Sequence, residues 1–204
     1  YNQLDASLIS VDSALIYRGM DIGTAKPSKV TLENYPHALI DICEPDESFS
    51  VNQFVSLAKQ HIESALNAGK LPILVGGTSF YFNALEHGLS KLPESTKDSR
   101  KYFNDRLKNQ GSEKLHSQLL KIDPTSATRI HPNDSQRVTR ALEVFHLSGV
   151  TLSELQGNKN ENKLNHEIKK IILMPERSEL HQRIEKRFIE MIKDGFLDEV
   201  ETLR

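Results

Sequence analysis

The spacing of apolar residues along the chain predicts two kinds of element. Apolar runs at residues 6–11, 38–43 and 71–75 are typical of buried β-strands, and the segment at residues 168–174 predicts a fourth. Strands that alternate with helices indicate an α/β fold with a mostly parallel sheet and helices on both faces. Apolar residues at helical spacing lie between the second and third runs; they are Val51, Phe54, Val55, Ala58, Ile62, Ala65 and Leu66.

Capping residues mark the ends of the predicted core helices. Ser50 and Gln53 form a capping box at the start of the helix between the second and third strands, and Gly69 follows its end. Ser178 is expected to cap a long C-terminal helix. The residues of that helix expected to face inward are Leu180, Ile184, Phe188 and Met191.

The pattern changes at about residue 94, and from there to residue 157 it predicts helices alone. Their boundaries are marked by Gly111, Ser112, Asp123 before Pro124, Asp134, and Thr151 with Glu154. A polar linker, GNKNENKLNH, follows at residues 157–166. The chain is therefore expected to form an α/β core from residues 1–93 and 158–204, interrupted by a small all-helical insert at residues 94–157.

Charge is distributed unevenly between these parts. Residues 97–140 hold ten Lys and Arg against five Asp and Glu, an excess of five positive charges, whereas the rest of the chain has a net charge of −7. A basic segment on an acidic body suggests a polyanionic partner. On charge alone, a solvated helical surface is the simpler explanation.

Composition indicates a cytoplasmic location. The single cysteine, Cys43, excludes an internal disulfide and favours a reducing compartment. No apolar run reaches the length of a membrane span, and no signal-peptide pattern opens the chain. We therefore expect a cytoplasmic protein without a membrane partner. A monomer is expected as well.

Polar loops follow two of the predicted strands and are the candidate site for ligand binding and catalysis. Asp12 and Ser13 follow the first strand, and Gly76-Gly77-Thr78 follows the third. In open α/β sheets, ligands bind beyond the carboxyl ends of the strands. Consecutive glycines and a helix N-terminus suit an anion, and a facing carboxylate suits proton transfer. The alternatives are an Asx turn or helix cap for Asp12 and a helix N-cap for Thr78.

Four blocks of the sequence resemble the signature blocks of bacterial tRNA dimethylallyltransferases. They are SVDSALIYRGMDIGTAKP, LPILVGGTSFYFNAL, RIHPNDSQRVTRALEVF and LHQRIEKRF, in the order of that family and with comparable spacing. The resemblance implies a P-loop-kinase-like core with a helical insert. It also implies transfer of a dimethylallyl group from dimethylallyl diphosphate, with Mg²⁺, to the N6 amine of the adenosine 3′ of the anticodon in certain tRNAs.

The resemblance assigns roles at the two strand ends. Asp12 would be the general base for the adenine amine, and Ser13, Ala14 and Leu15 would line the nucleotide. Thr78 would lie by the reacting groups. The diphosphate would be bound by Gly76, Gly77, Thr78 and Arg187. No ligands for the implied Mg²⁺ can be identified in this chain.

The resemblance also assigns the tRNA contacts. The anticodon loop would be gripped by Arg100, Gln136, Arg137, Val138, Thr139 and Arg140, which lie in the basic segment found independently. Gln136, Arg137 and Arg140 are expected on one exposed helix face, beside a buried stripe that includes Val138.

The chain departs from the family at both ends. No G-x-x-x-x-G-K-[ST] motif occurs in it, so the family's P-loop would precede Tyr1, and a further RNA-contacting region would follow Arg204. We therefore expect the 204 residues alone to be inactive and to lack a central strand.

Alternative functions remain open at this point. A small-molecule P-loop kinase or a free-nucleotide isopentenyltransferase would share the core but would not need the basic insert. A non-catalytic RNA-binding module would leave the placement of Asp12 and Thr78 unexplained.

Overall fold

The structure, a computed structural model, describes residues 4–157 and 163–204, so part of the polar linker lies outside the described residues. The chain forms two compact units, one from residues 1–87 and 163–204 and the other from residues 88–162. Among the described helices, none is both long enough and apolar enough to cross a bilayer.

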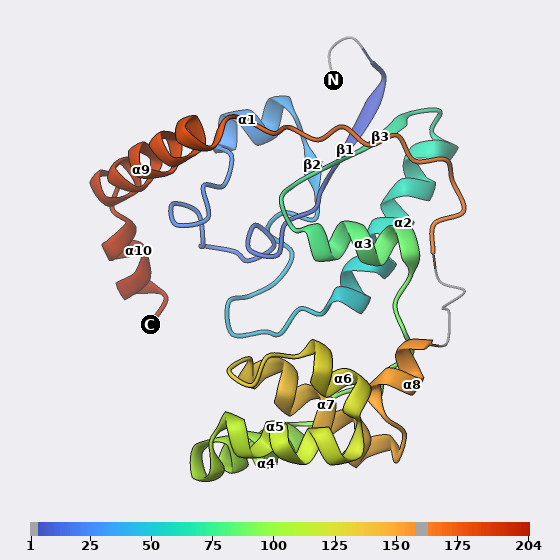
Figure 1. The fold of residues 1–204 in the computed structure, drawn as a ribbon. Coiled ribbons are helices and arrows are strands. Elements are labelled where there is room, and N and C mark those ends of the chain that lie inside the picture. The colour runs from blue at the N-terminus through green and yellow to red at the C-terminus, as the bar shows by residue number, and fades with distance from the viewer. Residues whose placement is uncertain (1–3, 158–162) are drawn as a thin grey trace. The chain divides into compact units, whose positions relative to one another are not determined.

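The first unit contains a three-stranded parallel sheet in the order β2-β1-β3 (Figure 1). Strand β1 (Ala6–Ser10) pairs with β3 (Leu71–Val75) from Ala6 opposite Leu71 to Ser10 opposite Val75. Strand β2 (His37–Ala38) pairs with the other edge of β1. The predicted first and third strands are thereby confirmed, as is the parallel α/β architecture.

Two helices pack together in this unit and cover part of the sheet. Helix α2 (Val51–Asn67) begins with the predicted capping box of Ser50 and Gln53, and it contacts β1, β3 and α3 (Ser79–His87). The rings of Phe54 and Tyr81 stack between α2 and α3 with their centroids 4.2 Å apart. Helix α1 (Lys29–Asn34) buries none of its residues.

The second predicted strand is mostly wrong. Only His37–Ala38 forms β2, because Leu39 and Asp41 adopt positive φ angles of 67° and 55° and turn the backbone out of the ladder. The N–H groups of Asp41 and Ile42 then donate to the carbonyls of Leu15 and Ile16. At the end of the predicted strand, Cys43 forms an isolated parallel bridge with Tyr17.

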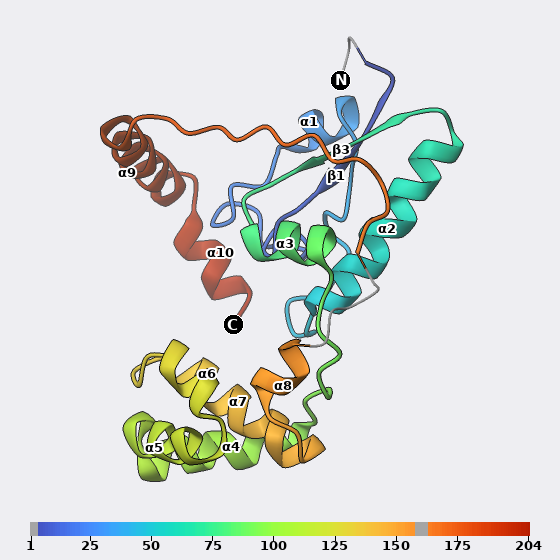
Figure 2. The ribbon, with the colours of Figure 1, turned by 45° about the vertical axis from the view of Figure 1, so that its right-hand side comes forward.

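The predicted strand at residues 168–174 is also wrong. The segment is irregular and leads into α9 (Arg177–Lys193) (Figure 2). Ile171 and Leu173 are 90% and 88% exposed. A strand requires a hydrogen-bonded neighbour, and within the described residues no strand pairs with the outer edge of β3. The apolar pattern therefore has no sheet position to occupy here.

The C-terminal helices differ from the prediction in their cap and burial. Helix α9 begins at Arg177 after Glu176, one residue before the predicted cap Ser178, and α10 (Phe196–Thr202) follows it. Leu180 and Phe188 are 41% and 55% exposed, so the stripe expected to face inward is only half covered. Helix α10 is the main helical neighbour of α9, and it is too short to cover a 17-residue helix.

The second unit is all-helical over the residues that the structure describes. Its helices are α4 (Lys97–Gln110), α5 (Ser112–Ile122), α6 (Pro124–Arg129), α7 (Ser135–Ser148) and α8 (Leu152–Gly157). Asp123 caps α6 through the N–H of Ser126 and also accepts from the N–H of Ser153, which ties α8 to α6. The core of this unit includes Phe103, Leu115, Leu119, Val138 and Val144. The predicted caps and helices are confirmed.

Candidate functional site

The loops that follow β1 and β3 lie against each other. The N–H of Val11 donates to the Val75 carbonyl (2.8 Å), and the N–H of Thr78 donates to the Val11 carbonyl (3.2 Å). The N–H of Ser13 then donates to Thr78 Oγ1 (3.1 Å). The structure therefore brings the Asp12-Ser13 turn and the Gly76-Gly77-Thr78 loop together at the carboxyl edge of the sheet.

The Asp12 carboxylate is held in place by one of its two oxygens. Its Oδ1 accepts hydrogen bonds from the N–H groups of Ala14 (2.8 Å) and Leu15 (3.2 Å), which is an Asx turn. Within the described residues, Oδ2 forms no hydrogen bond or ion pair. The side chain is half-buried, so Oδ2 can meet a ligand while Oδ1 fixes the orientation of the carboxylate.

Tyr81 of α3 lies close enough to Asp12 for their charges to interact. Burial raises the pKa of the Tyr81 phenol, and the charges of Tyr17 and Asp12 raise it further. The phenol therefore stays protonated at neutral pH.

The two glycines of the loop after β3 differ in how much space surrounds them. A Cβ on Gly76 would lie 2.1 Å from the Val11 carbonyl oxygen, so this position requires glycine for the backbone to approach β1. Gly77 has open space around the corresponding position and is exposed. The N–H groups available to an anion are therefore those of Gly77 and the first turn of α3.

Arg187 is not brought to this edge of the sheet. It is exposed on α9 and lines a pocket of about 360 Å³ with residues of the loop and helix that follow Asp12, among them Asp21, Lys26 and Leu32. Within the described residues, it forms no hydrogen bond or ion pair with Asp12 or Thr78.

Lys26 organises the loop after Asp12 and was missed by sequence reasoning. Its side chain is 4% exposed, and Nζ donates to Asp21 Oδ1 (2.6 Å), Asp41 Oδ1 (2.5 Å) and the Tyr17 carbonyl (2.7 Å). A lysine among the polar residues of a loop carries no sequence signal of burial, so only the fold reveals that it joins three segments.

Glu199 fastens α10 to the same loop and was also missed. Its Oε2 accepts from the N–H groups of Asp21 (2.8 Å) and Ile22 (2.6 Å), and its Oε1 accepts from that of Gly23 (2.9 Å). Burial alone would raise the pKa of Glu199, but these three hydrogen bonds outweigh it, and the pKa is lowered. The Phe196 ring fills the space beside Gly23, where a Cβ would lie 2.3 Å from it.

The residues expected to bind tRNA differ in their surroundings. Arg100, Gln136 and Arg137 are exposed, and Thr139 is half-buried with its hydroxyl donating to the Ser135 carbonyl (2.7 Å). Val138 is fully buried, so its side chain belongs to the core of the helical unit.

Arg140 does not share the exposed helix face that was predicted for it together with Gln136 and Arg137. The Arg137 side chain is 75% exposed, with Asp134 at 3.4 Å. Arg140 donates to Glu143 (2.7 Å), Ser95 (2.8 Å) and the Pro93 carbonyl (2.7 Å), and its side chain is 33% exposed. Its guanidinium therefore holds the segment before α4 against α7.

Glu143 is the buried partner of this arginine. Burial by itself raises the pKa of Glu143, but hydroxyl donors and the Arg140 charge lower it overall. The sequence carries one signal for the pair, because Glu143 follows Arg140 by three positions, the spacing of neighbours on a helix; Glu143 lies off the predicted apolar stripe, so its burial had no signal.

Comparison with known proteins gives a consistent result. The model of the family described as IPP transferase matches residues 15–204. The tRNA dimethylallyltransferase of Ruthia magnifica subsp. Calyptogena magnifica is 65% identical over 202 residues, which are 99% of this chain and 66% of that protein. The chain spans about two thirds of the length of the curated relatives that it matches.

Solved structures agree in fold. The tRNA isopentenylpyrophosphate transferase of Bacillus halodurans is 39% identical with a TM-score of 0.60, over 99% of this chain and 62% of that one. A eukaryotic dimethylallyltransferase acting on tRNA is 28% identical with a TM-score of 0.72, over 99% of this chain and 50% of that one. The similarity confirms the predicted P-loop-kinase-like α/β fold.

Proposed function

Because this chain belongs to the IPP transferase family, we propose that the protein transfers a dimethylallyl group from dimethylallyl diphosphate to the N6 amine of the adenosine 3′ of the anticodon in certain tRNAs. The names of its relatives support both the group transferred and the tRNA substrate. The main structural support for the proposal is the hydrogen bond from the Ser13 N–H to Thr78 Oγ1, because it joins the loops that follow β1 and β3.

Asp12 is the proposed general base. The adenine amine is a weak nucleophile because its lone pair is delocalised into the ring. As N6 attacks the allylic carbon, the new N–C bond forms, the C–O bond to the diphosphate breaks, and Asp12 Oδ2 accepts the N6 proton. The two N–H groups on Oδ1 support this role because they fix the direction of the carboxylate. Ser13, Ala14 and Leu15 then line the adenine.

The loop after β3 is the proposed site of the leaving diphosphate. Gly76 brings the loop close to β1, while Gly77, Thr78 and the first turn of α3 present N–H and O–H donors to the developing negative charge. Arg187 is a proposed diphosphate ligand on the strength of the family resemblance.

Mg²⁺ is part of the proposal only as a companion of the diphosphate. The described residues contain no group of three or more His, Cys, Asp or Glu side chains placed to hold a metal ion. Mg²⁺ is commonly bound by one or two carboxylates together with substrate phosphates. In the two strand-end loops that the structure describes, Asp12 supplies the carboxylate, so these loops fit Mg²⁺ only together with oxygens from the diphosphate, and no step is assigned to the metal.

The helical unit is the proposed holder of the anticodon loop. Arg100, Gln136 and Arg137 are exposed and offer donors to phosphates and unstacked base edges, and Thr139 and Arg140 stand next to them on α7. Val138 supports this helix from the core. The target adenosine must leave its stack to reach Asp12, as RNA-modifying enzymes commonly require.

A substrate comparison tests the proposal. The full-length protein is incubated with dimethylallyl diphosphate, Mg²⁺ and either tRNA or free adenosine monophosphate, and the nucleosides are analysed by mass spectrometry. We expect N6-dimethylallyladenosine in tRNA alone. Prenylation of free nucleotide alone would indicate a free-nucleotide isopentenyltransferase, and tRNA binding without product would indicate an RNA-binding module. Light scattering and cell fractionation would test the expected cytoplasmic monomer.

A further inference from the structure

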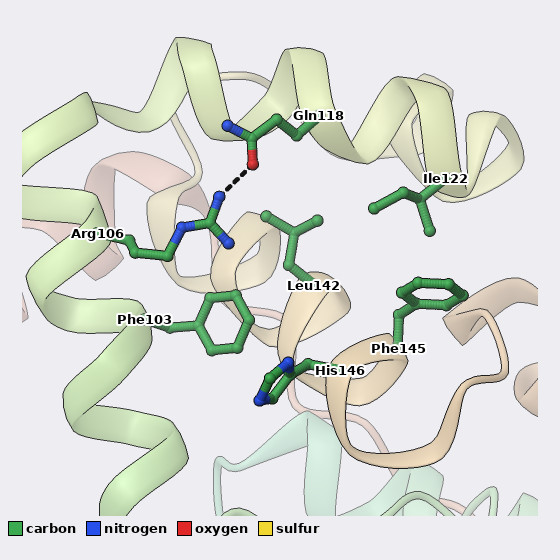
Figure 3. A pocket seen from close by; sticks show the side chains of 7 residues that line it. All are labelled: Phe103, Arg106, Gln118, Ile122, Leu142, Phe145 and His146. Atoms are coloured by element: carbon green, nitrogen blue, oxygen red, sulfur yellow. Dashed lines mark hydrogen bonds between the residues drawn. The ribbon is translucent and has the colours of Figure 1, made fainter.

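We propose that a surface pocket of the helical unit binds an unstacked nucleobase of the RNA substrate; this inference rests on the proposed function. The pocket, called here the α4–α5–α7 pocket, has a volume of about 310 Å³. It is lined by Phe103, Arg106, Gln118, Ile122, Leu142, Phe145 and His146 (Figure 3). None of these residues belongs to the proposed anticodon grip.

The walls of the pocket are suited to the face of a planar ring. Ile122 and Phe145 are half-buried and leave apolar surface open to a ligand, while the buried Phe103 and Leu142 lie beneath it. In Figure 3, Leu142 lies between the rings of Phe103 and Phe145. Unstacked RNA bases are commonly held against such aromatic and aliphatic side chains.

Planar polar groups stand beside these walls and suit the edge of a base. The Arg106 guanidinium lies 5.5 Å from the Phe103 ring centre and 5.6 Å from that of Tyr102. The His146 ring stacks on Tyr102 with centroids 5.4 Å apart. Of this stacked pair, His146 itself lines the pocket, so its ring stands beside the place a planar base would occupy.

The rim also retains hydrogen-bonding capacity. Arg106 donates to Gln118 Oε1, which in the described part of the chain is the one acceptor of a guanidinium with five N–H groups. The His146 ring is exposed and forms no hydrogen bond with any described residue. A ligand with acceptor atoms on its edge, such as a nucleobase, can use both groups.

The charges around the pocket favour a nucleic acid over an apolar protein segment. Lys114 and Lys121 lie four residues before and three residues after Gln118 on α5, so both neighbour it on the helix surface, and both are exposed. Residues 97–140 carry five excess positive charges. Phosphates on either side of a base in the pocket would therefore meet lysine side chains.

The pocket reads a nucleotide other than those near Arg137. At about 100° per residue, Leu142, Phe145 and His146 lie on one side of α7, whereas Gln136 and Arg137 lie on the opposite side. The base in the pocket is therefore that of a different unpaired nucleotide of the same stem–loop.

An abasic scan of a stem–loop RNA tests the inference with the full-length protein. The RNA is a synthetic anticodon stem–loop in which each unpaired nucleotide in turn lacks its base. The protein variants are Phe145→Leu, which removes a ring but keeps an apolar side chain, and His146→Ala at the surface. Leu147→Ala, an exposed neighbour on α7 that does not line the pocket, is the matched control. Affinity is measured by fluorescence anisotropy, and folding by thermal melts.

We expect one abasic position to weaken binding to the unaltered protein by about 5- to 150-fold, the range for a stacked base. Phe145→Leu and His146→Ala should weaken binding of the intact RNA and show a smaller further loss at that position. Leu147→Ala should behave like the unaltered protein.

Two results would overturn the inference in distinguishable ways. If the stem–loop binds and Arg137→Ala weakens it, but neither pocket variant differs from Leu147→Ala, the pocket does not hold a base and the proposed function stands. If the unaltered protein binds no stem–loop, both proposals fall. His146→Ala decides the matter if Phe145→Leu does not fold, because His146 is exposed.

Discussion

Replacing Glu199 with glutamine should release α10 from the loop that follows Asp12. The carboxylate accepts three backbone N–H groups, two on Oε2 and one on Oε1. In Glu199→Gln, the amide oxygen can occupy the Oε2 position and keep the first two bonds. Its NH₂ group then faces the N–H of Gly23, so one bond and the negative charge are lost.

The size of the effect follows from this count. A hydrogen bond to a charged group contributes about 1.5–3 kcal/mol, and the loss of one such bond sets the expected cost of Glu199→Gln. The cost is expected near the lower end because the carboxylate is partly exposed. Since about 1.4 kcal/mol is a factor of ten in equilibrium, the amides of residues 21–23 should exchange roughly 10-fold faster.

Hydrogen exchange followed by mass spectrometry or NMR measures this directly. Glu201→Gln, on the same helix and exposed, is the control for loss of one charge. Equal exchange at residues 21–23 in the two variants would refute the reasoning.

The pH dependence of stability gives a second measure of the same contact. Because the pKa of Glu199 is lowered by folding, its stabilisation is fully present above the unfolded pKa of about 4.3 and is lost as the pH falls through the folded value. The melting temperatures of the unaltered protein and Glu199→Gln should therefore differ at pH 7 and converge in acid. A difference that persists unchanged in acid would contradict the assignment.

Three further predictions concern the helical unit, the sheet edge and the activity of the chain. Arg140→Ala should destabilise the protein by about 1–3 kcal/mol in a thermal melt, because the buried Glu143 loses its charged partner. Arg137→Ala should change stability by no more than about 0.5 kcal/mol but should reduce the salt slope of tRNA binding by about one. The reverse pattern would contradict these assignments. Gly76→Ala should cost about 1–3 kcal/mol in denaturant unfolding, because its Cβ would meet the Val11 carbonyl, and an unchanged midpoint would refute that contact. The 204 residues alone should transfer no dimethylallyl group to tRNA, and multiple turnovers by them would disprove this expectation.

Local signals in the sequence were sufficient for most of the elements. The capping box at Ser50, Gly111 and the Asp123-Pro124 pair each satisfy backbone groups within a few residues, so the helices they bound could be predicted closely. Strands β1 and β3 could be predicted because each is a short apolar run that ends at a polar or glycine-containing turn, although β3 is an edge strand of the described sheet and none of its residues is fully buried.

Elements that depend on distant partners could not be predicted in this way. Residues 168–174 have a strand pattern, but pairing requires a neighbouring strand, and pattern alone does not provide one. Leu39 adopts a positive φ angle, which is uncommon for leucine, and Asp41 adopts another, which aspartate tolerates better, so the turn that ends β2 had no clear signal in the apolar run.

In the candidate site, too, some residues could be predicted from the sequence and others could not. Asp12 and Thr78 could be placed together because the carboxyl ends of parallel strands share one edge of the sheet. Glu199 binds a backbone group 177 residues away, and Lys26 binds groups up to 15 residues away that only the folded loop brings together, so nothing local distinguishes either from a surface charge.

The rate of the transfer step in Asp12→Asn, measured beside tRNA affinity, decides whether Asp12 is the general base. The substitution keeps an oxygen for the N–H groups of Ala14 and Leu15, so the turn should survive while the base is lost. In single turnovers by the full-length protein, the account predicts a rate about 10²- to 10⁴-fold lower with tRNA affinity little changed. A near-normal rate would contradict it, because Asp12 would then be only the cap of its turn.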